Sequence, residues 1–472
     1  MLRGKVSAST KAALCSKSGS ILGSTKIQTP KLLKSPVRQQ TMAYATKKSF
    51  SQKSGGSDEK RRTTPAKNRD GFIYSFAHTA PYSNFHLKAP KITNEVFDLA
   101  TVFPEDVSKR LPKSKVYEYS QKSIPSLIHL GSFNPDQKNE LFNKHISLFR
   151  TSSSAQIFDI LKAGISSPSS GNRFCITGAK GSGKTTAITH AQSFAVEQGY
   201  VVIHISRALD LVSGRYDASL VKNSRLQSSD STGRVFNQPM YVNNLMRKIA
   251  KANKDVLGSI NLSKEYEFPA SRSFKALKFT PTDSLYTMLM NGRTHIEKCE
   301  VFNAFLEELS LQKQAPVLFT MDDFNALSHH SYAVNRDVDN NPIYHGELQL
   351  PKIFLDFFSG ERTFQNGVIM TGLSSYKNGY TIPHGLGQGK PYAYAKSSDY
   401  DPTLAGKMRA NGGVKAINIE PLTLEETEAL LKYYSSGKVI HQPVDESFVQ
   451  QKYFLSGNGN PLALLKSCIE VY

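Results

Sequence analysis

The sequence predicts an α/β protein with a parallel five-stranded sheet, a C-terminal helical lid and an extended N-terminal arm. Short apolar runs alternate with helical segments from about residue 140 onward. Strands that alternate with helices form parallel sheets covered by helices on both faces. A glycine-rich segment, 178–185, lies between one of these strands and the next helix, and capped helical segments fill residues 421–472.

The N-terminal part differs from the rest in its charge. Residues 1–70 contain 16 Lys and Arg but 3 Asp and Glu, so they hold +13 of the chain's net charge of +20, and no acidic residue precedes Asp58. A basic, Ser- and Thr-rich segment without acids is typical of a mitochondrial transit peptide. We therefore predict a disordered basic segment over 1–70 that includes a transit peptide and directs the protein to the mitochondrial matrix. A disordered tail that binds polyanions is the alternative.

Three regions follow this segment. Residues 71–140 contain many prolines and scattered aromatic residues, which predicts an extended arm that lies against the protein's own core or a partner. Residues 141–420 hold the predicted sheet, and 421–472 form the lid. The predicted strands are 174–176, 201–205, 317–321, 368–371 and 414–419. The predicted helices are 184–198, one from Pro239, one around 302–309, and three in the lid that begin near Thr423, Asp445 and Pro461.

Several classes of site are excluded by the composition. The four cysteines form no CxxC pair, so we expect neither a structural zinc site nor a disulfide partner. No run of 18 apolar residues occurs, so no membrane-spanning helix is expected. The pairing of His329-His330 with Asp337 and Asp339 has the spacing of no known metal site, and we interpret that stretch as a polar loop. The cysteines are Cys15, Cys175, Cys299 and Cys468.

The glycine-rich segment matches the pattern G-x-x-x-x-G-K-[ST] throughout. Glycines let backbone N–H groups curl around phosphates, and the helix that follows adds a favourable dipole for an anion. Lys184 is expected to reach the β- and γ-phosphates, and the hydroxyl of Thr185 to bind Mg²⁺. A chance Gly-Lys-Thr in a loop is the alternative, but the preceding strand and following helix favour a nucleotide site. The candidate nucleotide contacts are Gly178, Ala179, Lys180, Gly181, Ser182, Gly183, Lys184, Thr185 and Thr186.

Two acids follow the strand predicted over 317–321. Asp322 is the candidate metal carboxylate, which would hold Mg²⁺ directly or through water. Asp323 stands where ATPases with an extra strand between these two motifs usually carry a glutamate that deprotonates the attacking water. An aspartate there is one methylene shorter, so we weigh a slow catalytic base equally against a solvated loop carboxylate.

The strand predicted over 368–371 ends in a further polar candidate. Thr371 occupies a position that commonly faces the γ-phosphate, and Ser374 is the second candidate for this role. A strand-end threonine that satisfies a local backbone group is an equally good interpretation.

The lid is indicated by two segments taken together. Pro421–Glu426 reads Pro-Leu-Thr-Leu-Glu-Glu before a helix, and 458–464 reads Asn-Gly-Asn-Pro-Leu-Ala-Leu. Small helical lids of AAA+ and STAND proteins show a similar arrangement. The predicted fold is therefore a P-loop NTPase, AAA+/STAND-like. No N-K-x-D motif follows the loop, so Ras-like guanine recognition is not encoded.

With these motifs the chain resembles the death-associated protein 3 family, the GTP-binding protein of the mitochondrial ribosomal small subunit. The resemblance covers about 140–470. It rests on the loop at 178–185, the strand at 201–205, the Phe-Asn-Gln-Pro at 236–239, and the Asp-Asp-Phe-Asn-Ala-Leu at 322–327. Some relatives have glycine at the position of Asp323, which leaves hydrolysis by this chain an open question.

The resemblance implies a structural ribosomal protein that holds GTP or GDP with Mg²⁺ and touches small-subunit ribosomal RNA and neighbouring ribosomal proteins. The motif itself leaves ATP open. Ribosomal RNA would be met through basic side chains on phosphates, although charge for solubility is the better interpretation of any single one. Arg207 or Arg215 could instead reach a nucleotide phosphate. The candidates are Lys88, Lys91, Lys109, Arg110, Lys113, Lys115, Arg207, Arg215, Lys222, Arg225 and Arg234.

A second hypothesis is enzymatic. A matrix AAA+ or STAND-type NTPase would act on nucleic acid or signal by nucleotide-driven oligomerisation, with Asp323 as base and an arginine supplied in trans. We expect no robust turnover from this chain, and at most a weak GTPase.

Overall fold

The computed structural model describes residues 116–139, 146–148, 150, 152–214, 216, 218–221, 234–270, 275–328, 335–337, 339–374, 379–389 and 400–469. The predicted transit segment and the arm up to residue 115 lie outside the described residues. So do His329, His330 and the basic candidates Arg215, Lys222 and Arg225.

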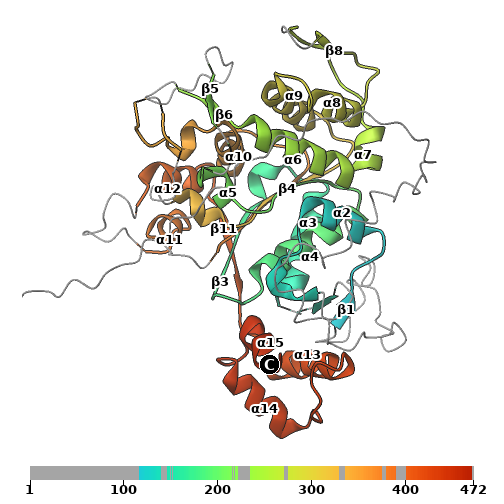
Figure 1. Cartoon of the computed structure of the whole chain (residues 1–472), viewed down its shortest axis with the longest axis vertical. Coiled ribbons are helices and arrows are strands. Elements are labelled where there is room, and N and C mark those ends of the chain that lie inside the picture. The colour runs from blue at the N-terminus through green and yellow to red at the C-terminus, as the bar shows by residue number, and fades with distance from the viewer. Residues whose placement is uncertain are drawn as a thin grey trace, which may run out of the picture. The chain divides into compact units, whose positions relative to one another are not determined.

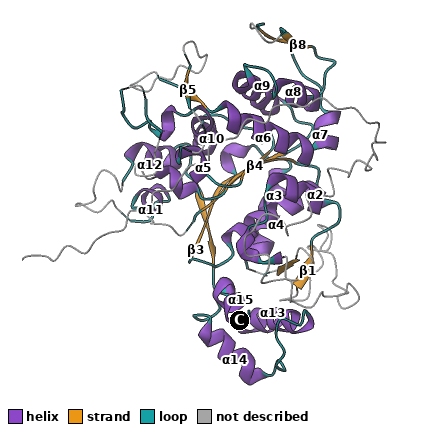
Figure 2. Cartoon of the chain, in the orientation of Figure 1, coloured by secondary structure: helices purple, strands orange, loops and turns teal. Residues whose placement is uncertain are grey.

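Five parallel strands form the central sheet (Figure 2). All five strands of the sequence prediction are confirmed, with ends shifted by three residues or fewer. The strand order is β11-β3-β10-β9-β4, so the strand before the glycine-rich loop has β10 and β11 as its neighbours. The bounds are β3 Arg173–Gly178, β4 Val201–Ile205, β9 Val317–Met321, β10 Gly367–Gly372 and β11 Lys415–Ile419.

The register brings the carboxyl ends of the strands to one edge. Thr371 of β10 pairs with Cys175 on one side and Met321 on the other. Ile205 of β4 also pairs with Met321. The polar residues that follow these strand ends therefore share one edge, which is where open α/β sheets place their ligands.

Helices cover both faces of the sheet, as predicted (Figure 1). Alternate residues of a strand point to opposite faces. Leu318 and Met370 belong to the core that contains α3 and α4, and Phe319 belongs to the core that contains α6, α9 and α10. These side chains are fully buried, and each stabilises the fold by about 2 kcal/mol. The bounds are α3 Ser153–Gly164, α4 Lys184–Glu197, α6 Pro239–Ala252, α9 Lys298–Leu311 and α10 Gln349–Ser359.

Smaller helices and strands connect these elements. The short helices are α5 Leu209–Val212, α7 Lys254–Ser259, α8 Leu285–Gly292, α11 Thr381–Gly385 and α12 Pro402–Arg409. Two antiparallel pairs join β5 Ser219–Leu220 to β6 Phe236–Asn237 and β7 Tyr266–Phe268 to β8 Leu277–Phe279.

The outer edge of β4 is covered by one side chain. Asn253, at the end of α6, accepts a hydrogen bond from the Val202 N–H at 2.7 Å and donates to the Val202 carbonyl at 2.9 Å. An exposed edge strand is a template for pairing with another chain. Asn253 thus supplies the hydrogen bonds that a sixth strand would otherwise make at this position.

The described part of the predicted arm contains regular structure. Strand β1 Val116–Glu118 pairs with β2 Ile146–Leu148, and helix α2 Ser123–Leu130 lies between them in the chain. Helix α2 packs against α4 and α6, and its Leu127 and Leu130 are fully buried. This segment therefore lies against the protein's own core, one of the two placements expected for the arm.

Three helices follow the sheet within 421–472, the segment named the lid in the sequence prediction, and the three helix starts agree with that prediction. The helices are α13 Leu424–Ser436, α14 Glu446–Leu455 and α15 Pro461–Cys468. Each begins at a side-chain cap, from Thr423, Asp445 and Asn460 respectively. The lid has its own apolar core, which includes Leu431, and Val116 and Leu148 of the β1–β2 pair pack on that core.

Three of the four cysteines lie in the described part of the chain. Cys175, Cys299 and Cys468 are buried free thiols, while Cys15 lies outside that part of the chain. Among the helices that the structure describes, none has both the length and the apolar character needed to cross a membrane.

Two buried histidines are held uncharged. His204 of β4 lies 2.9 Å from Thr320 Oγ1, which also accepts a hydrogen bond from Gln192 at 3.0 Å. Burial and the charge of Lys248 lower the pKa of His204 to about 3. Burial and the charge of Arg150 lower the pKa of His190 to about 4.

These two pKa values predict acid sensitivity. The ordinary histidine pKa is about 6.5, so the stability that depends on neutral His204 and His190 is present above that pH. It is lost as the pH falls from 6.5 toward 4, because the histidines of the unfolded chain become protonated in this range while those of the folded chain stay neutral. We expect a loss of a few kcal/mol, measured by circular dichroism melting at pH 7 and pH 5. His204→Gln should flatten this dependence and the exposed His441→Gln should not; equal slopes in wild type and His204→Gln would contradict the prediction.

Candidate functional site

The glycine-rich loop joins β3 to α4 in a conformation that depends on its glycines. Gly178, Gly181 and Gly183 have φ of +147°, +77° and +97°, a region that side chains rarely adopt. A Cβ at Gly178 would lie 2.8 Å from the Ile419 carbonyl oxygen, and one at Gly181 would lie 2.7 Å from Asn460 Oδ1. The loop can therefore take this shape only with glycine at these positions. Ala179 and Lys180, at its tip, are exposed.

Lys184 lies folded over the loop. Its Nζ donates to the Gly178 carbonyl at 2.9 Å and to the Ala179 carbonyl at 2.6 Å. The residue is 7% exposed, and burial lowers its pKa while Asp322 acts in the opposite direction. An ammonium group is thus held at the mouth of the loop, where an anionic ligand would neutralise it.

A hydrogen bond joins the loop to the end of β9. Thr185 Oγ1 donates to Asp322 Oδ2 at 2.7 Å, and Asp322 Oδ1 accepts from the Asp323 N–H at 2.9 Å. Asp322 is 9% exposed, and burial raises its pKa despite these donors and Lys184. The sequence predicts Thr185 and Asp322 as a pair of magnesium ligands, and the fold brings both oxygens together.

The loop has features that fit a phosphate group. In the described part of the chain the Ser182 hydroxyl is buried without a hydrogen-bond partner. A Cβ at Gly183 would meet no atom within 4 Å. Gly183 also leaves the first turn of α4 without a capping side chain, so backbone N–H groups are available for an anion. Hydroxyl and carboxylate oxygens such as those of Thr185 and Asp322 are the donors that Mg²⁺ prefers.

Asp323 has an unusual backbone. Its φ is +60°, in the left-handed region, which Asp tolerates better than most residues. Its carboxylate lies 4.0 Å from Arg207 Nε. Burial raises its pKa and the charge of Asp322 acts in the same direction, while hydrogen bonding by Ser374 and Leu209 and the charge of Arg207 act against them. The structure thus places Asp323 beside the segment that follows β4, an arrangement that suits anchoring at least as well as the predicted role of a base.

Thr371 and Ser374 end up in different surroundings. Thr371 is fully buried and its Oγ1 donates to the Phe174 carbonyl at 3.4 Å, which favours the backbone-satisfying interpretation. The Ser374 N–H donates to Asn325 Oδ1 at 2.8 Å. Thr186 Oγ1 accepts from Gln137 Nε2 at 3.4 Å, so it is tied to the segment after α2.

Among the basic candidates in the described part, Arg207 and Arg234 differ. Arg234 forms ion pairs with Asp337 at 2.7 Å and Glu347 at 3.2 Å. Its charge is therefore neutralised within the protein. The side chain of Arg207 is 54% exposed and lies at the strand edge that carries Asp322.

The lid contacts the loop directly. Asn460 Nδ2 donates to the Lys180 carbonyl at 2.5 Å, and the Leu462 N–H donates to the Gly181 carbonyl at 3.3 Å. These contacts take up loop carbonyls. The sequence indicated a helix start at Pro461, and the structure adds that this start rests on the loop.

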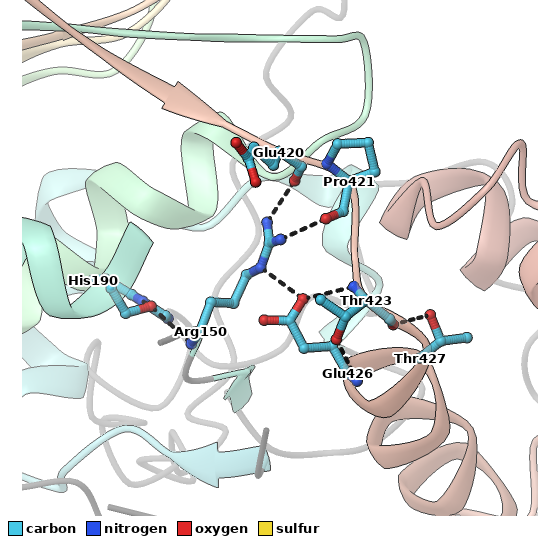
Figure 3. A network of polar contacts seen from close by, with 8 residues as sticks. Arg150, His190, Glu420, Pro421, Thr423, Glu426 and Thr427 are labelled. Atoms are coloured by element: carbon cyan, nitrogen blue, oxygen red, sulfur yellow. Dashed lines mark hydrogen bonds and ion pairs between the residues drawn. The ribbon is translucent and has the colours of Figure 1, made fainter. Parts of the chain in front are cut away.

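Arg150 ties the segment before α3 to the linker that leads into the lid (Figure 3). Its guanidinium donates to Glu426 Oε2 at 3.1 Å, to the Glu420 carbonyl at 2.8 Å and to the Pro421 carbonyl at 2.7 Å. Glu426 also accepts from the Thr423 N–H at 3.0 Å, completing the capping box of α13. One carboxylate therefore serves both the helix start and the arginine.

The sequence prediction missed Arg150 because nothing local marks it. It stands outside any motif, and its partners are 270 to 276 residues later in the chain. The capping pattern of Thr423 and Glu426 is visible in the sequence, but its second use as a partner for a distant arginine is not.

Comparisons with known proteins find one family and two relatives. A family model described as mitochondrial ribosomal death-associated protein 3 matches residues 147–467. The small ribosomal subunit protein mS29 of Neurospora crassa is 24% identical over 384 residues, which covers 76% of each chain. The protein of the same description from Schizosaccharomyces pombe is 23% identical over 365 residues, covering 75% of this chain and 71% of the relative.

Replacing Arg150 tests the linker contacts. Arg150→Ala leaves the buried Glu426 carboxylate without its cation, so we expect a loss of about 3 kcal/mol in the free energy of unfolding. Arg150→Lys should recover little of it, because lysine cannot present three donors in one plane. Chemical denaturation measures the loss, with the exposed Arg247→Ala as control. A loss in Arg150→Ala no larger than in the control would contradict the role given to this residue.

Replacing Asp322 tests the electrostatics of the site. Because the folded pKa of Asp322 is raised, ionisation costs stability as the pH rises above the ordinary aspartate value of about 3.9. Without nucleotide and with EDTA, Asp322→Asn should melt at or above the wild-type temperature at pH 7, and the difference should shrink toward pH 4. The exposed Asp159→Asn is the control. A ligand-free Asp322→Asn protein that melts well below wild type at pH 7 would show that the carboxylate stabilises the empty site.

Proposed function

This chain belongs to the mitochondrial ribosomal death-associated protein 3 family, whose model matches more than half of its residues, and we propose that it works as a structural component of the small ribosomal subunit that holds a guanine nucleotide with Mg²⁺. The protein is mitochondrial, as is its family. The two fungal relatives are themselves described as small ribosomal subunit proteins.

The observation that supports nucleotide binding most directly is the contact between Thr185 and Asp322 at 2.7 Å. It joins the loop that would hold the phosphates to the carboxylate that would hold the metal. In the proposal Lys184 turns from the loop carbonyls to the β- and γ-phosphates, and Thr185 and Asp322 share the Mg²⁺. GTP or GDP is the expected ligand from the family resemblance, and ATP is the alternative that the loop leaves open.

The strand order supports a P-loop NTPase fold of the AAA+/STAND-like kind. Strand β10 lies between β3, which leads into the loop, and β9, which leads into Asp322. The extra strand between these two motifs is the arrangement that the sequence analysis associates with that class. The lid follows the sheet directly and rests on the loop through Asn460.

In this proposal the nucleotide acts on stability. A ligand that binds only the folded state stabilises it by mass action, by about 4 kcal/mol at a thousandfold excess over Kd. Burial disfavours the charged forms of Lys184 and Asp322. A bound phosphate and a metal ion would compensate these two charges, so the ligand would stabilise the folded state through these residues. The ligand would thus stabilise the folded domain that is incorporated into the small ribosomal subunit.

Contacts with ribosomal RNA and ribosomal proteins are the other half of the proposal. Phosphate contacts from Lys and Arg position a protein on RNA without reading its sequence. Of the described candidates, Arg234 is neutralised by two acids. We therefore assign RNA contacts mainly to the basic candidates other than Arg207 and Arg234, all of which lie outside the described residues.

The cellular experiment is sedimentation of mitochondrial extract through a sucrose gradient, followed by extraction of nucleotide from the fraction that contains this protein. Co-migration with the small ribosomal subunit and recovery of GTP or GDP are expected. Sedimentation away from the subunit, together with turnover above about 1 s⁻¹ that nucleic acid stimulates, would support the alternative of an AAA+ or STAND-type NTPase.

Lys184→Ala tests whether the ligand matters for the protein. The variant loses the ammonium group that would meet the phosphates, so GDP with Mg²⁺ should raise its melting temperature far less than that of wild type, and its incorporation into the small subunit should fall. Lys251→Ala, on the exposed side of α6, is the matched control. Equal ligand-induced shifts in melting temperature and equal incorporation for Lys184→Ala and wild type would contradict the proposal.

A further inference from the structure

We propose that Arg207 binds the γ-phosphate of the nucleotide from a position that Asp323 fixes, so that the site distinguishes a nucleoside triphosphate from a diphosphate. This inference rests on the nucleotide site proposed above. It adds a residue that belongs to neither the glycine-rich loop nor the metal carboxylate.

The backbone of Arg207 is held beside the metal carboxylate. Beyond the sheet, β4 and β9 stay paired: the Asp322 N–H donates to the Ile205 carbonyl at 2.9 Å, and the Ala208 N–H donates to the Asp322 carbonyl at 3.0 Å. Arg207 lies between these two hydrogen bonds. Its Cα is therefore fixed at the same edge as the Asp322 side chain, which contacts Thr185 of the loop.

The guanidinium group is anchored at one end only. Its Nε lies 4.0 Å from Asp323 Oδ2. In the part of the chain that the structure describes, no hydrogen bond or further ion pair engages its two terminal nitrogens. Their planar fork matches a phosphate group in two parallel hydrogen bonds. Half of the side chain is exposed, so these nitrogens can reach a ligand without breaking internal contacts.

Asp323 is itself fixed in position, so it can orient the Arg207 side chain. Its left-handed backbone, at φ +60°, is uncommon for a residue with a side chain, and such conformations persist where the surroundings fix them. The side chain is 15% exposed, Ser374 and Leu209 form hydrogen bonds with its carboxylate, and Oδ2 faces Arg207 Nε at 4.0 Å. A carboxylate so placed acts through the arginine, which makes Asp323 a positioning residue.

The charges favour a role in reading the third phosphate. Asp322 repels an anion, whereas Lys184 and Arg207 attract it, and Asp323 contributes through its ion pair with Arg207. A triphosphate brings more negative charge to this edge than a diphosphate, and opposite charges in a partly buried site attract strongly. Loss of Arg207 should therefore weaken the triphosphate complex selectively. A direct contact between Arg207 and ribosomal RNA is the competing assignment.

The experiment measures Kd by calorimetry for GDP and for the slowly hydrolysed analogue GTPγS, each with Mg²⁺, on the full chain. For Arg207→Ala we expect roughly tenfold weaker binding of GTPγS, the order of one charge-assisted hydrogen bond, and less than threefold weaker binding of GDP. Arg207→Lys should lie between wild type and Arg207→Ala. Asp323→Asn, which keeps a residue suited to positive φ, should shift the GTPγS-to-GDP ratio in the same direction. Arg247→Ala should match wild type.

Three results would overturn the assignment of Arg207 to the γ-phosphate. Equal weakening of both ligands in Arg207→Ala, or none, overturns the inference and leaves the nucleotide site standing. Unchanged nucleotide binding with weaker binding to small-subunit RNA assigns Arg207 to the RNA and also overturns it. A wild-type chain that binds neither nucleotide overturns both this inference and the proposed nucleotide site. Melting curves confirm that each variant is folded.

Discussion

The hydrogen bond from Thr185 to Asp322 is the contact on which the site depends. It joins the first turn of α4, which follows β3 and the loop, to the residue after β9, and β10 lies between β3 and β9. Only a glycine at the end of β10 permits this, because a Cβ on Gly372 would lie 2.6 Å from Asp322 Oδ1. The strand register, the glycine and the buried carboxylate are thus one arrangement. A change in any of them would separate the loop from the carboxylate that follows β9.

Burial sets the electrostatic character of this edge. It lowers the pKa of Lys184 and raises those of Asp322 and Asp323, so each of these groups is less stable in its charged form than it would be in water. His204, one strand away, is held neutral by the same effect. The fold therefore concentrates groups whose charge is disfavoured at the edge of the sheet where the proposed ligand would bind, so that a bound ligand would stabilise the fold.

Much of this structure could be predicted from the sequence, for local physical reasons. Apolar runs such as 317–321 fix strands, and the G-x-x-x-x-G-K-T pattern requires a turn between a strand and a helix, so the sheet and loop follow from short segments. Thr423, Asp445 and Asn460 are residue types that cap helices, so the lid helices follow as well. What could not be predicted depends on partners far away in the chain. Asn253 covers a strand about fifty residues before it, and Arg150 finds Glu426 across 276 residues. The role of Asp323 was predicted from its motif position, and the structure adds its left-handed backbone and its neighbours, among them Arg207.

The position of β3 in the sheet has a consequence for the time course of folding. Its two neighbours, β10 and β11, come from residues 367–372 and 415–419, so the strand that leads into the loop stays unpaired until most of the chain exists. Contacts of such long sequence separation slow folding, because the entropy of closing the intervening chain must be overcome first. The loop therefore matures late during synthesis, and truncation before residue 415 would leave one edge of β3 open. A ligand of this loop would therefore bind only a chain that is nearly complete.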